Sequence, residues 1–320
     1  MRKVLVTGAA GFIGSHLCEK LLGLGDEVVG IDNFDPFYAR SIKEKNLDAF
    51  RNHSSFRFAE LDILDFPGLQ SLFAANSFTH IVHLAAKAGV RPSIAEPLAY
   101  QKCNIEGTVN LLELAREFGV MKFIFASSSS VYGNNKKVPF SETDPVDNPI
   151  SPYAATKKSC EVLSFTYHHL YRMDITGLRF FTVYGPRQRP EMAIHKFTRA
   201  IDEGKPIPVY GYGKPRRDYT YIDDIIQGVV AATDRVSGYE IINLGESNTI
   251  STTDLITLIE TNLGRKAVRE DMPMQPGDVR VTFADISKAK KLLGYAPSTP
   301  VEKGIEKFVK WYLNQKKTED

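Results

Sequence analysis

The sequence predicts an α/β protein built on a doubly wound parallel sheet, and three observations lead to this fold class. Short apolar runs rich in β-branched residues alternate with helical patterns over residues 1–180. A glycine-rich turn joins the first of these runs to the first helix. Carboxylates and small residues follow the later runs. Such alternation is typical of one parallel sheet with helices on both faces and with ligands at the carboxyl ends of its strands.

The chain is long enough for one large domain or for two joined domains, with 320 residues of which 43% are hydrophobic. The strict alternation ends after Pro186, where prolines break the pattern into short elements. We therefore expect residues 1–180 to form the sheet domain and residues 181–320 a smaller mixed domain that binds the substrate. Part of 217–245 is expected to return to the sheet domain.

Composition excludes several classes of function. The formal net charge is +2, which gives no reason to expect a nucleic acid partner. The three cysteines (Cys18, Cys103 and Cys160) are widely spaced, so neither a disulfide framework nor a metal site is expected. No apolar stretch has the length of a signal or membrane-spanning segment. We expect a cytoplasmic protein without a membrane partner.

The first strand, 4–7, leads into Gly8-Ala9-Ala10-Gly11-Phe12-Ile13-Gly14 and then into a helix expected over 15–24. Glycines permit a tight turn and a close approach of the backbone, so a pyrophosphate could bind at the amino end of the helix. The second strand, 27–31, ends at Asp32, whose carboxylate would hold ribose hydroxyls. Asn33 follows, not arginine, and an acid at position 32 repels a 2′-phosphate. The sequence therefore favours NAD over NADP.

The next two strands also end in residues suited to a cofactor. The strand at 56–61 ends at Asp62 and Ile63, which could contact the adenine, although Asp62 could equally cap the following helix. The strand at 80–84 runs into Ala85 and Ala86, whose small side chains leave room for a ligand. The predicted cofactor-binding residues are Gly8, Gly11, Phe12, Ile13, Gly14, Asp32, Asn33, Asp62, Ile63, Leu84, Ala85, Ala86, Tyr153 and Lys157.

A long helix over 99–118 and a fifth strand over 122–126 precede the serine run 127–130. Tyr153 and Lys157 follow, four residues apart, so they lie on the same face of a helix. An ammonium within about 4–6 Å favours the phenolate form of a tyrosine, which could then exchange a proton with a hydroxyl group. Ser128 could share that proton. The alternative is a surface lysine one turn beyond a tyrosine, since this short motif often occurs by chance.

Taken in order, these motifs resemble those of the extended short-chain dehydrogenase/reductases that act on nucleotide sugars. The segments that carry the resemblance are the glycine turn 8–14, Asp32-Asn33, Asp62-Ile63, Leu84-Ala85-Ala86, the serine segment 127–133, Tyr153 with Lys157, and 179–186. The resemblance implies a Rossmann fold with tightly held NAD, Tyr153 as acid/base, Lys157 on the nicotinamide ribose, and Ser128 polarising the reacting hydroxyl. It also implies a homodimer whose four-helix interface is formed by 99–118 and 153–171.

The second half of the chain resembles the family's substrate-binding part. There the resemblance implies that Val209 and Tyr210 lie by the uracil, that Arg217 contacts the diphosphate, and that Asp278 holds the uridine ribose. Relatives that act on UDP-galactose have an arginine where this chain has Gln275. Arg280 is the candidate for that second phosphate cation.

The loop 187–193 contains two arginines and stands just beyond Thr182. Such runs are often solvated loops, but arginines beside an active site also bind carboxylates. In form the loop resembles that of the uronate epimerases, in which the arginine before the proline reaches the sugar, so Arg189 is preferred to Arg187. Ser129, Ser130 and Thr182 could add hydroxyl donors around a carboxylate.

The outcome expected after oxidation at C4 of the sugar is return of the hydride to the opposite face. Relatives that eliminate water or decarboxylate have carboxyl residues where this chain has Ser129 and Ser130, and a serine cannot replace a carboxyl acid/base. The sequence thus predicts a UDP-sugar 4-epimerase that most resembles UDP-glucuronate 4-epimerases. The alternatives are a UDP-glucose/UDP-galactose 4-epimerase, a UDP-glucuronate decarboxylase, and a non-catalytic NAD-binding sensor.

Overall fold

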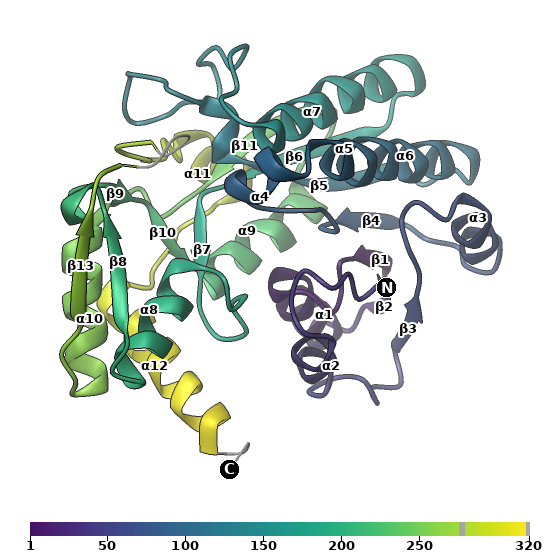
Figure 1. Cartoon of the computed structure of the whole chain (residues 1–320). Coiled ribbons are helices and arrows are strands. Elements are labelled where there is room, and N and C mark those ends of the chain that lie inside the picture. Colours follow the sequence, from purple (N-terminus) through teal and green to yellow (C-terminus); the bar gives the residue numbers. More distant parts are fainter. Residues whose placement is uncertain (275–278, 318–320) are drawn as a thin grey trace.

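The central element of the computed structural model, which describes residues 1–274 and 279–317, is a seven-stranded sheet (Figure 1). Every pair of neighbouring strands in this sheet is parallel, and the strand order is β11-β6-β5-β4-β1-β2-β3. The strands are β1 (Lys3–Thr7), β2 (Glu27–Asp32), β3 (Phe56–Glu60), β4 (His80–His83), β5 (Lys122–Ser128), β6 (Asp174–Phe180) and β11 (Tyr239–Leu244). The order reverses beside β1, which confirms the doubly wound sheet predicted from the sequence.

Alternate residues of the central strand β1 point to opposite faces of the sheet and belong to two separate cores. Val4 and Val6 pack with α1 (Phe12–Gly23) and α9 (Ile222–Arg235). Leu5 packs on the other face with α3 (Phe66–Ala74), α6 (Gly107–Glu117) and α7 (Pro152–Tyr171). Both faces are therefore buried, which is the reason that β1 reads as a continuous apolar run.

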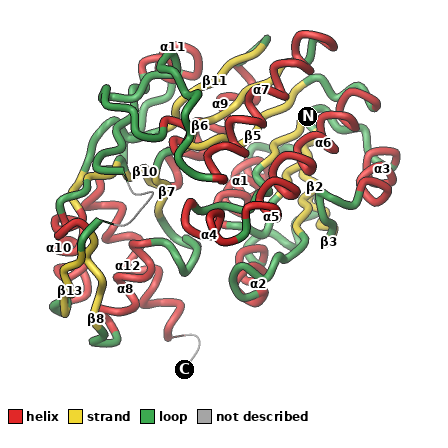
Figure 2. Tube along the Cα trace, turned by 45° about the horizontal axis from the view of Figure 1, so that its top comes forward, coloured by secondary structure: helices red, strands yellow, loops and turns green. Residues whose placement is uncertain are grey.

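The long helix predicted over 99–118 is wrong in detail, because the structure divides this segment. It consists of α5 (Pro97–Gln101), a π-helical turn η1 (Lys102–Glu106) and α6 (Gly107–Glu117). Asn104, in the wide turn, accepts a hydrogen bond from the amide of Lys87 and donates to Thr156. The turn thus fastens the helix to the loop after β4 and to α7, whereas a uniform helical periodicity carries no sign of it. Figure 2 shows α5 and α6 following one another in one line, with α7 beside them.

The second half of the chain forms smaller sheets and helices beside the main sheet (Figure 1). Its strand pairs are β7 (Thr182–Tyr184) with β10 (Tyr219–Tyr221), β8 (Pro206–Tyr210) with β13 (Val268–Met272), and β9 (Arg216–Arg217) with β12 (Ile250–Ser251). The remaining helices are α2 (Arg40–Leu47), α4 (Val90–Ala95), α8 (Ala193–Asp202), α10 (Thr252–Leu263), α11 (Ser287–Leu293) and α12 (Val301–Lys317), with short turns η2 (Ser129–Tyr132) and η3 (Gly211–Gly213).

Two segments of this second half, α9 and β11, lie against or within the main sheet. The division into domains at residue 180 stays a prediction. Among the described residues, no helix combines the length and apolar character needed to cross a membrane. The same residues contain no group of three or more histidine, cysteine, aspartate or glutamate side chains placed to hold a metal ion.

Candidate active site

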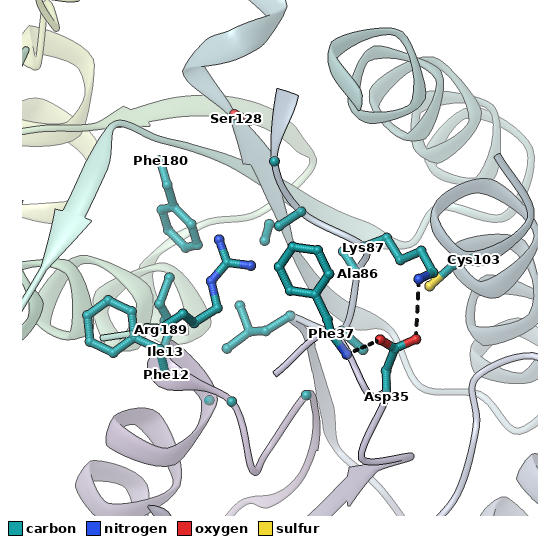
Figure 3. Close-up of a pocket in the computed structure, with 18 of the residues that line it drawn as sticks. Phe12, Ile13, Asp35, Phe37, Ala86, Lys87, Cys103, Ser128, Phe180 and Arg189 are labelled. Carbon is teal, nitrogen blue, oxygen red and sulfur yellow. Dashed lines mark hydrogen bonds and ion pairs between the residues drawn. The ribbon is translucent and has the colours of Figure 1, made fainter. Parts of the chain in front are cut away.

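A cavity of about 390 Å³ opens at the carboxyl edge of the main sheet (Figure 3). All the predicted cofactor-binding residues line it, as do Ser128, Ser129, Ser130, Thr182 and Arg189. These residues come from the ends of β1 to β6, from α1 and α7, and from the loop before α8. The topology therefore brings together residues as far apart in the sequence as Gly8 and Arg189.

The glycine turn between β1 and α1 is compact because its backbone packs on itself and on the end of β4. Gly8 has a positive φ of 72°, and a Cβ at this position would lie 2.9 Å from the amide nitrogen of Ala85. A Cβ at Gly14 would lie 2.0 Å from the carbonyl oxygen of Gly8. Only glycine fits at both positions, and the amino end of α1 remains open to the cavity. This is the arrangement that a pyrophosphate needs.

Asp32 ends β2 as predicted and is almost fully buried. Its carboxylate accepts a hydrogen bond of 2.9 Å from the amide of Phe34 and lies 3.6 Å from Nζ of Lys43. Lys43 is also buried and lines the cavity, although the sequence analysis did not single it out. A carboxylate and a lysine at this edge are suitable partners for the hydroxyls of a ribose.

Asp62 lies beside Asn33 at the same end of the cavity. The Asn33 amide donates to the Asp62 carboxylate over 2.8 Å. Asp62 does not cap the helix that follows it, because the residue before α3 is Asp65, whose carboxylate accepts from the amide of Gly68. The alternative explanation of Asp62 as a helix cap is therefore wrong, and its side chain is available to a ligand in the cavity.

Tyr153 and Lys157 lie in the first turns of α7. The helix begins after Ser151, whose hydroxyl accepts a hydrogen bond from the amide of Ala154. Lys157 is only 5% exposed, and its Nζ donates to the carbonyl oxygen of Ala126 over 2.8 Å. This contradicts the alternative of a surface lysine. The ammonium is fixed at the end of β5, on the side of the helix that faces the cavity with Tyr153.

Ser128 ends β5 in the wall of the same cavity. Its hydroxyl accepts from the amide of Ser130 and donates to the Ser130 hydroxyl, with both distances 3.1 Å. The ring of Tyr153 packs edge-on against Tyr100, with centroids 6.2 Å apart. A phenol, an ammonium and a hydroxyl thus line one cavity, which is the set required to move a proton to and from a substrate hydroxyl.

A buried ion pair stands behind this set. Arg179 on β6 donates to both carboxylate oxygens of Glu161 on α7 over 2.8 and 2.9 Å, and Ser127 donates to the same carboxylate over 2.7 Å. Burial alone would raise the pKa of Glu161, but the hydrogen bonds and charge of Arg179 lower it below its ordinary value. This network ties α7 to β5 and β6 and so determines where Tyr153 meets the serine run.

The two arginines of the loop before α8 point in different directions. Arg189 lines the cavity, and in Figure 3 its guanidinium group lies beside the ring of Phe37. Arg187 has a positive φ of 63° and pairs with Glu19 on α1 over 2.8 Å. Arg189 therefore lines the cavity and Arg187 does not, while the contact of Arg189 with the sugar stays a prediction.

Four of the predicted nucleotide-binding residues of the second half do not line this cavity: Val209, Tyr210, Arg217 and Arg280. Val209 is buried in β8, and the ring of Tyr210 stacks on Arg91 at 4.9 Å. Arg217 donates to the carbonyl oxygen of Arg216, and Arg280 belongs to the segment that pairs with Arg216. Asp278, like Gln275, lies outside the described residues. The roles of these residues stay predictions.

Several cavity residues were missed by the sequence analysis. Lys87 follows the predicted alanines and pairs over 3.4 Å with Asp35, another residue that lines the cavity (Figure 3). Phe37 comes from the loop after β2, and Phe180 from the end of β6. The position of Lys87 directly after a strand end could have identified it. The other two stand in loops or at strand ends where apolar residues give no functional signal.

The fold and the site together define an extended short-chain dehydrogenase/reductase, with a dinucleotide site at the sheet edge and a serine, tyrosine and lysine beside it. Residues 5–308 match the protein family described as GDP-mannose 4,6 dehydratase, and the chain belongs to this family. The resemblance inferred from the sequence motifs is confirmed.

Relatives within the family support a narrower comparison. The chain is 48% identical over 308 residues to a UDP-glucuronate 4-epimerase of Thermodesulfobacterium geofontis, covering 96% of this chain and 95% of the relative. The crystal structure of UDP-glucuronic acid 4-epimerase from Bacillus cereus, in complex with UDP-glucuronic acid and NAD, is 40% identical with a TM-score of 0.92. That match covers 98% of this chain and 99% of the other. UDP-glucose 4-epimerase of Thermotoga maritima, crystallised with UDP-glucose, is 34% identical with a TM-score of 0.91, covering 99% and 100%.

Proposed function

We propose that the protein is an NAD-dependent UDP-sugar 4-epimerase that interconverts UDP-glucuronate and UDP-galacturonate. The observation that carries this proposal is the composition of one cavity wall. Ser128, Tyr153 and Lys157 would supply the proton-transfer set, and Arg189 would supply a cation in the same cavity as the hydroxyls of Thr182 and the serine run. The identity to UDP-glucuronate 4-epimerases supports the choice of substrate.

The residues of the cavity account for the steps that the protein itself performs. NAD, when bound, accepts the hydride from C4 of the sugar and returns it. Tyr153 would take the proton of the C4 hydroxyl, and Ser128 would hold that oxygen by a hydrogen bond. Lys157, fixed on Ala126, keeps a positive charge at this end of the cavity. The 4-keto sugar then turns its other face toward the cofactor. Reversal of the proton transfer at this stage completes an epimerisation.

The residues also explain how NAD would be held. The glycine turn would offer its amides to the pyrophosphate, Asp32 would bind the adenosine ribose, and Asp62 with Ile63 would contact the adenine. Because the hydride returns in every cycle, NAD remains a cofactor that need not leave. Acid treatment of the purified protein should release NAD in an amount close to one per chain. A purified protein that retains no NAD even after incubation with NAD would contradict this part.

A UDP-glucose/UDP-galactose 4-epimerase is the second candidate, favoured by the likeness to the Thermotoga maritima enzyme. The test is to incubate the protein separately with UDP-glucuronate, UDP-glucose and UDP-N-acetylglucosamine and to identify the products by chromatography and NMR. UDP-galacturonate from the first sugar, at a kcat/KM well above the other two, is the expected result. Formation of a UDP-pentose as the main product would indicate a decarboxylase, and no product from any sugar would indicate the NAD-binding sensor.

We also propose that the protein is a homodimer. Large apolar side chains are exposed on α7 and on the neighbouring helices, among them Val162 and Phe165 at 54% and 50% and Leu98 at 77%. A second copy packed across these helices would bury them. A monomeric mass by light scattering at micromolar concentration would contradict this.

The cytoplasmic location expected from the sequence also remains a proposal.

A further inference from the structure

Arg189 is held by groups of its own loop as well as by the loop after β2. Its Nη1 lies 3.2 Å from Oε1 of Glu191, and its Nη2 donates to Sδ of Met192 over 3.5 Å. On another side, Cζ lies 5.7 Å from the centroid of the Phe37 ring. The guanidinium group is therefore oriented before any substrate arrives, with Glu191 occupying one of its two terminal nitrogens.

Glu191 pairs with Arg189 but does not itself line the cavity. Arg189 and Met192 line the cavity, whereas Glu191 is not among the lining residues. Both carboxylate oxygens of Glu191 are buried, and within the described part of the chain neither accepts a hydrogen bond. Among the described residues, the cation within 4 Å of the Glu191 carboxylate is the guanidinium group of Arg189. A buried carboxylate requires a cation, so Glu191 and Arg189 hold each other in place.

The loop that carries the pair is anchored at its base. Gln188 is 1% exposed, its side chain donates to the carbonyl oxygen of Val183 over 3.0 Å, and its amide donates to Gly185. The amide of Met192 donates to the carbonyl oxygen of Arg189, which closes a turn around Glu191. Gln188 thus ties the backbone before Arg189 to β7, and the Met192 amide closes the turn after it. On this fixed backbone, the Glu191 contact adds to the direction of the guanidinium group.

We propose that Glu191 is a positioning residue that holds the Arg189 guanidinium in the direction in which its remaining N–H groups can meet the carboxylate of a bound uronate. This inference rests on the proposed function. Its physical reason lies in the 4-keto uronate, which is a β-keto acid. When the bond between C5 and the carboxylate carbon aligns with the carbonyl π system, it can break. Its electron pair then forms an enolate, carbon dioxide leaves, and a proton adds to C5. A guanidinium fixed in direction restrains the rotation of the carboxylate and opposes this loss.

The pair Arg187–Glu19 provides a control, because Arg187 of the same loop pairs with Glu19 of α1 and neither residue lines the cavity. The variants to compare are Glu191→Ala, Glu191→Gln, Arg189→Ala and, as the control, Glu19→Gln. The ratio of UDP-pentose and carbon dioxide to UDP-galacturonate is measured for each with UDP-glucuronate as substrate. The Kd values for UDP-glucuronate and UDP-glucose are measured on NAD-loaded protein in a Tyr153→Phe background, where turnover does not interfere.

We expect Glu191→Ala to increase the fraction of decarboxylated product by about tenfold and to weaken UDP-glucuronate binding by about 10-fold, since the contact it orients is charge-assisted. UDP-glucose binding should change by less than about twofold, because a neutral sugar presents no carboxylate to that edge. Glu191→Gln keeps an acceptor oxygen at the same place and should retain most of the product ratio of the wild type. Glu19→Gln should behave as the wild type in both measurements.

The proposal is overturned if Arg189→Ala releases carbon dioxide but Glu191→Ala keeps the wild-type product ratio. It is equally overturned if Glu191→Ala weakens both sugars alike, because the residue would then serve only the stability of the loop. A wild-type protein that does not epimerise UDP-glucuronate contradicts the proposed function instead. In that case the role of Glu191 is tested by the ratio of the Kd values for UDP-glucose and UDP-glucuronate. If this ratio is the same in Glu191→Ala as without that substitution, the role of Glu191 is rejected.

Discussion

The surroundings of Lys157 show that its spacing of four residues from Tyr153 is not a chance match on the protein surface. Its side chain crosses from α7 to the end of β5 and is buried there against the Ala126 carbonyl. A lysine is buried only when the structure provides a partner for its charge. Here the partner leaves the ammonium in the wall of the cavity that Tyr153 and Ser128 also line. The contact therefore supports a role in the chemistry and not only in stability.

The prediction at this scale concerns the phenol of Tyr153. Tyr153→Phe removes the hydroxyl with little change of volume and should lower kcat by about 10²–10⁴-fold, the range expected for loss of an acid/base. Binding of UDP-glucuronate should change little, as measured by calorimetry, and NAD content should stay the same. As a control, Tyr100→Phe removes the hydroxyl that donates to Ala88 from the ring packed against Tyr153 and should keep most of the activity. Unchanged kcat in Tyr153→Phe would reject the assignment of the acid/base.

At the scale of the element, the start of α1 depends on how closely the glycine turn packs. Gly11 is the extended residue before the first helical turn, so the helix begins at Phe12, three residues earlier than the sequence predicted. The difference arises because the apolar residues 12 and 13 were read as part of the turn. Residues 12 and 13 instead form the first turn of α1, and this turn lines the cavity.

Two glycines of α1 give a matched pair of substitutions. A Cβ at Gly14 would lie 2.0 Å from the Gly8 carbonyl oxygen, whereas a Cβ at Gly23 would meet no atom within 4 Å. Gly14→Ala should therefore displace the turn and reduce NAD retention at least about tenfold, since the pyrophosphate site depends on that backbone. Gly23→Ala should stabilise the protein by about 0.5–1 kcal/mol, because alanine favours a helix.

The measurements are NAD content after gel filtration and thermal unfolding of both variants. If Gly14→Ala retained NAD as Gly23→Ala does, the glycine turn would not be the pyrophosphate site. A loss of stability in Gly23→Ala would contradict the open surroundings at the end of α1.

At the scale of the whole molecule, Asp218 joins three segments that are far apart in the sequence. Its carboxylate accepts hydrogen bonds from the amides of Glu246, Ser247 and Ala284. Burial raises the pKa of Asp218 to about 6, although these hydrogen bonds lower it in part. Burial also raises the pKa of Glu246 to about 7, with the charges of Asp224 and Asp218 adding to the effect. Two carboxyl groups thus meet where the main sheet and the second half of the chain join.

This junction predicts a pH dependence of stability. The folded protein binds the proton of Glu246 more tightly than the unfolded chain, whose glutamate titrates near about 4.3. The stabilisation is therefore complete below that value and is lost as the pH rises through about 7. Glu246→Gln removes this titration, so its gain in unfolding free energy over the wild type should be larger at pH 8 than at pH 5.

Urea unfolding of the wild type and Glu246→Gln at pH 5 and pH 8 measures this gain at each pH. The contributions of most other titrating groups cancel, because they are the same in both proteins. Glu240→Gln is a suitable control, because Glu240 pairs with Lys288 at a half-exposed site. A gain for Glu246→Gln that is equal at pH 5 and pH 8 would mean that the Glu246 carboxyl is not perturbed by its burial.

The local parts of the structure could be predicted from the sequence, and this includes much of the candidate site. The parallel sheet follows from apolar runs that alternate with helices, and the glycine turn follows from its position between a strand and a helix. Tyr153 and Lys157 share a face because they are four residues apart on one helix. Strand ends of a parallel sheet meet at one edge, so residues after β1 to β5 had to converge. Periodicity and chain order are sufficient for each of these conclusions.

The tertiary structure alone decided where side chains of the loops and of irregular turns point. Arg187 and Arg189 stand two residues apart in a loop, yet one contacts α1 and the other faces the cavity. Lys43 meets Asp32, and the wide turn at Asn104 meets the loop after β4, through contacts between distant segments. A loop has no period that relates spacing to direction, so its contacts depend on how the rest of the chain packs. The sequence therefore determined the fold class and pointed to the residues proposed to transfer the proton. The counter-ion of Arg189, and with it the arrangement that could hold a uronate, emerged only when the chain was folded.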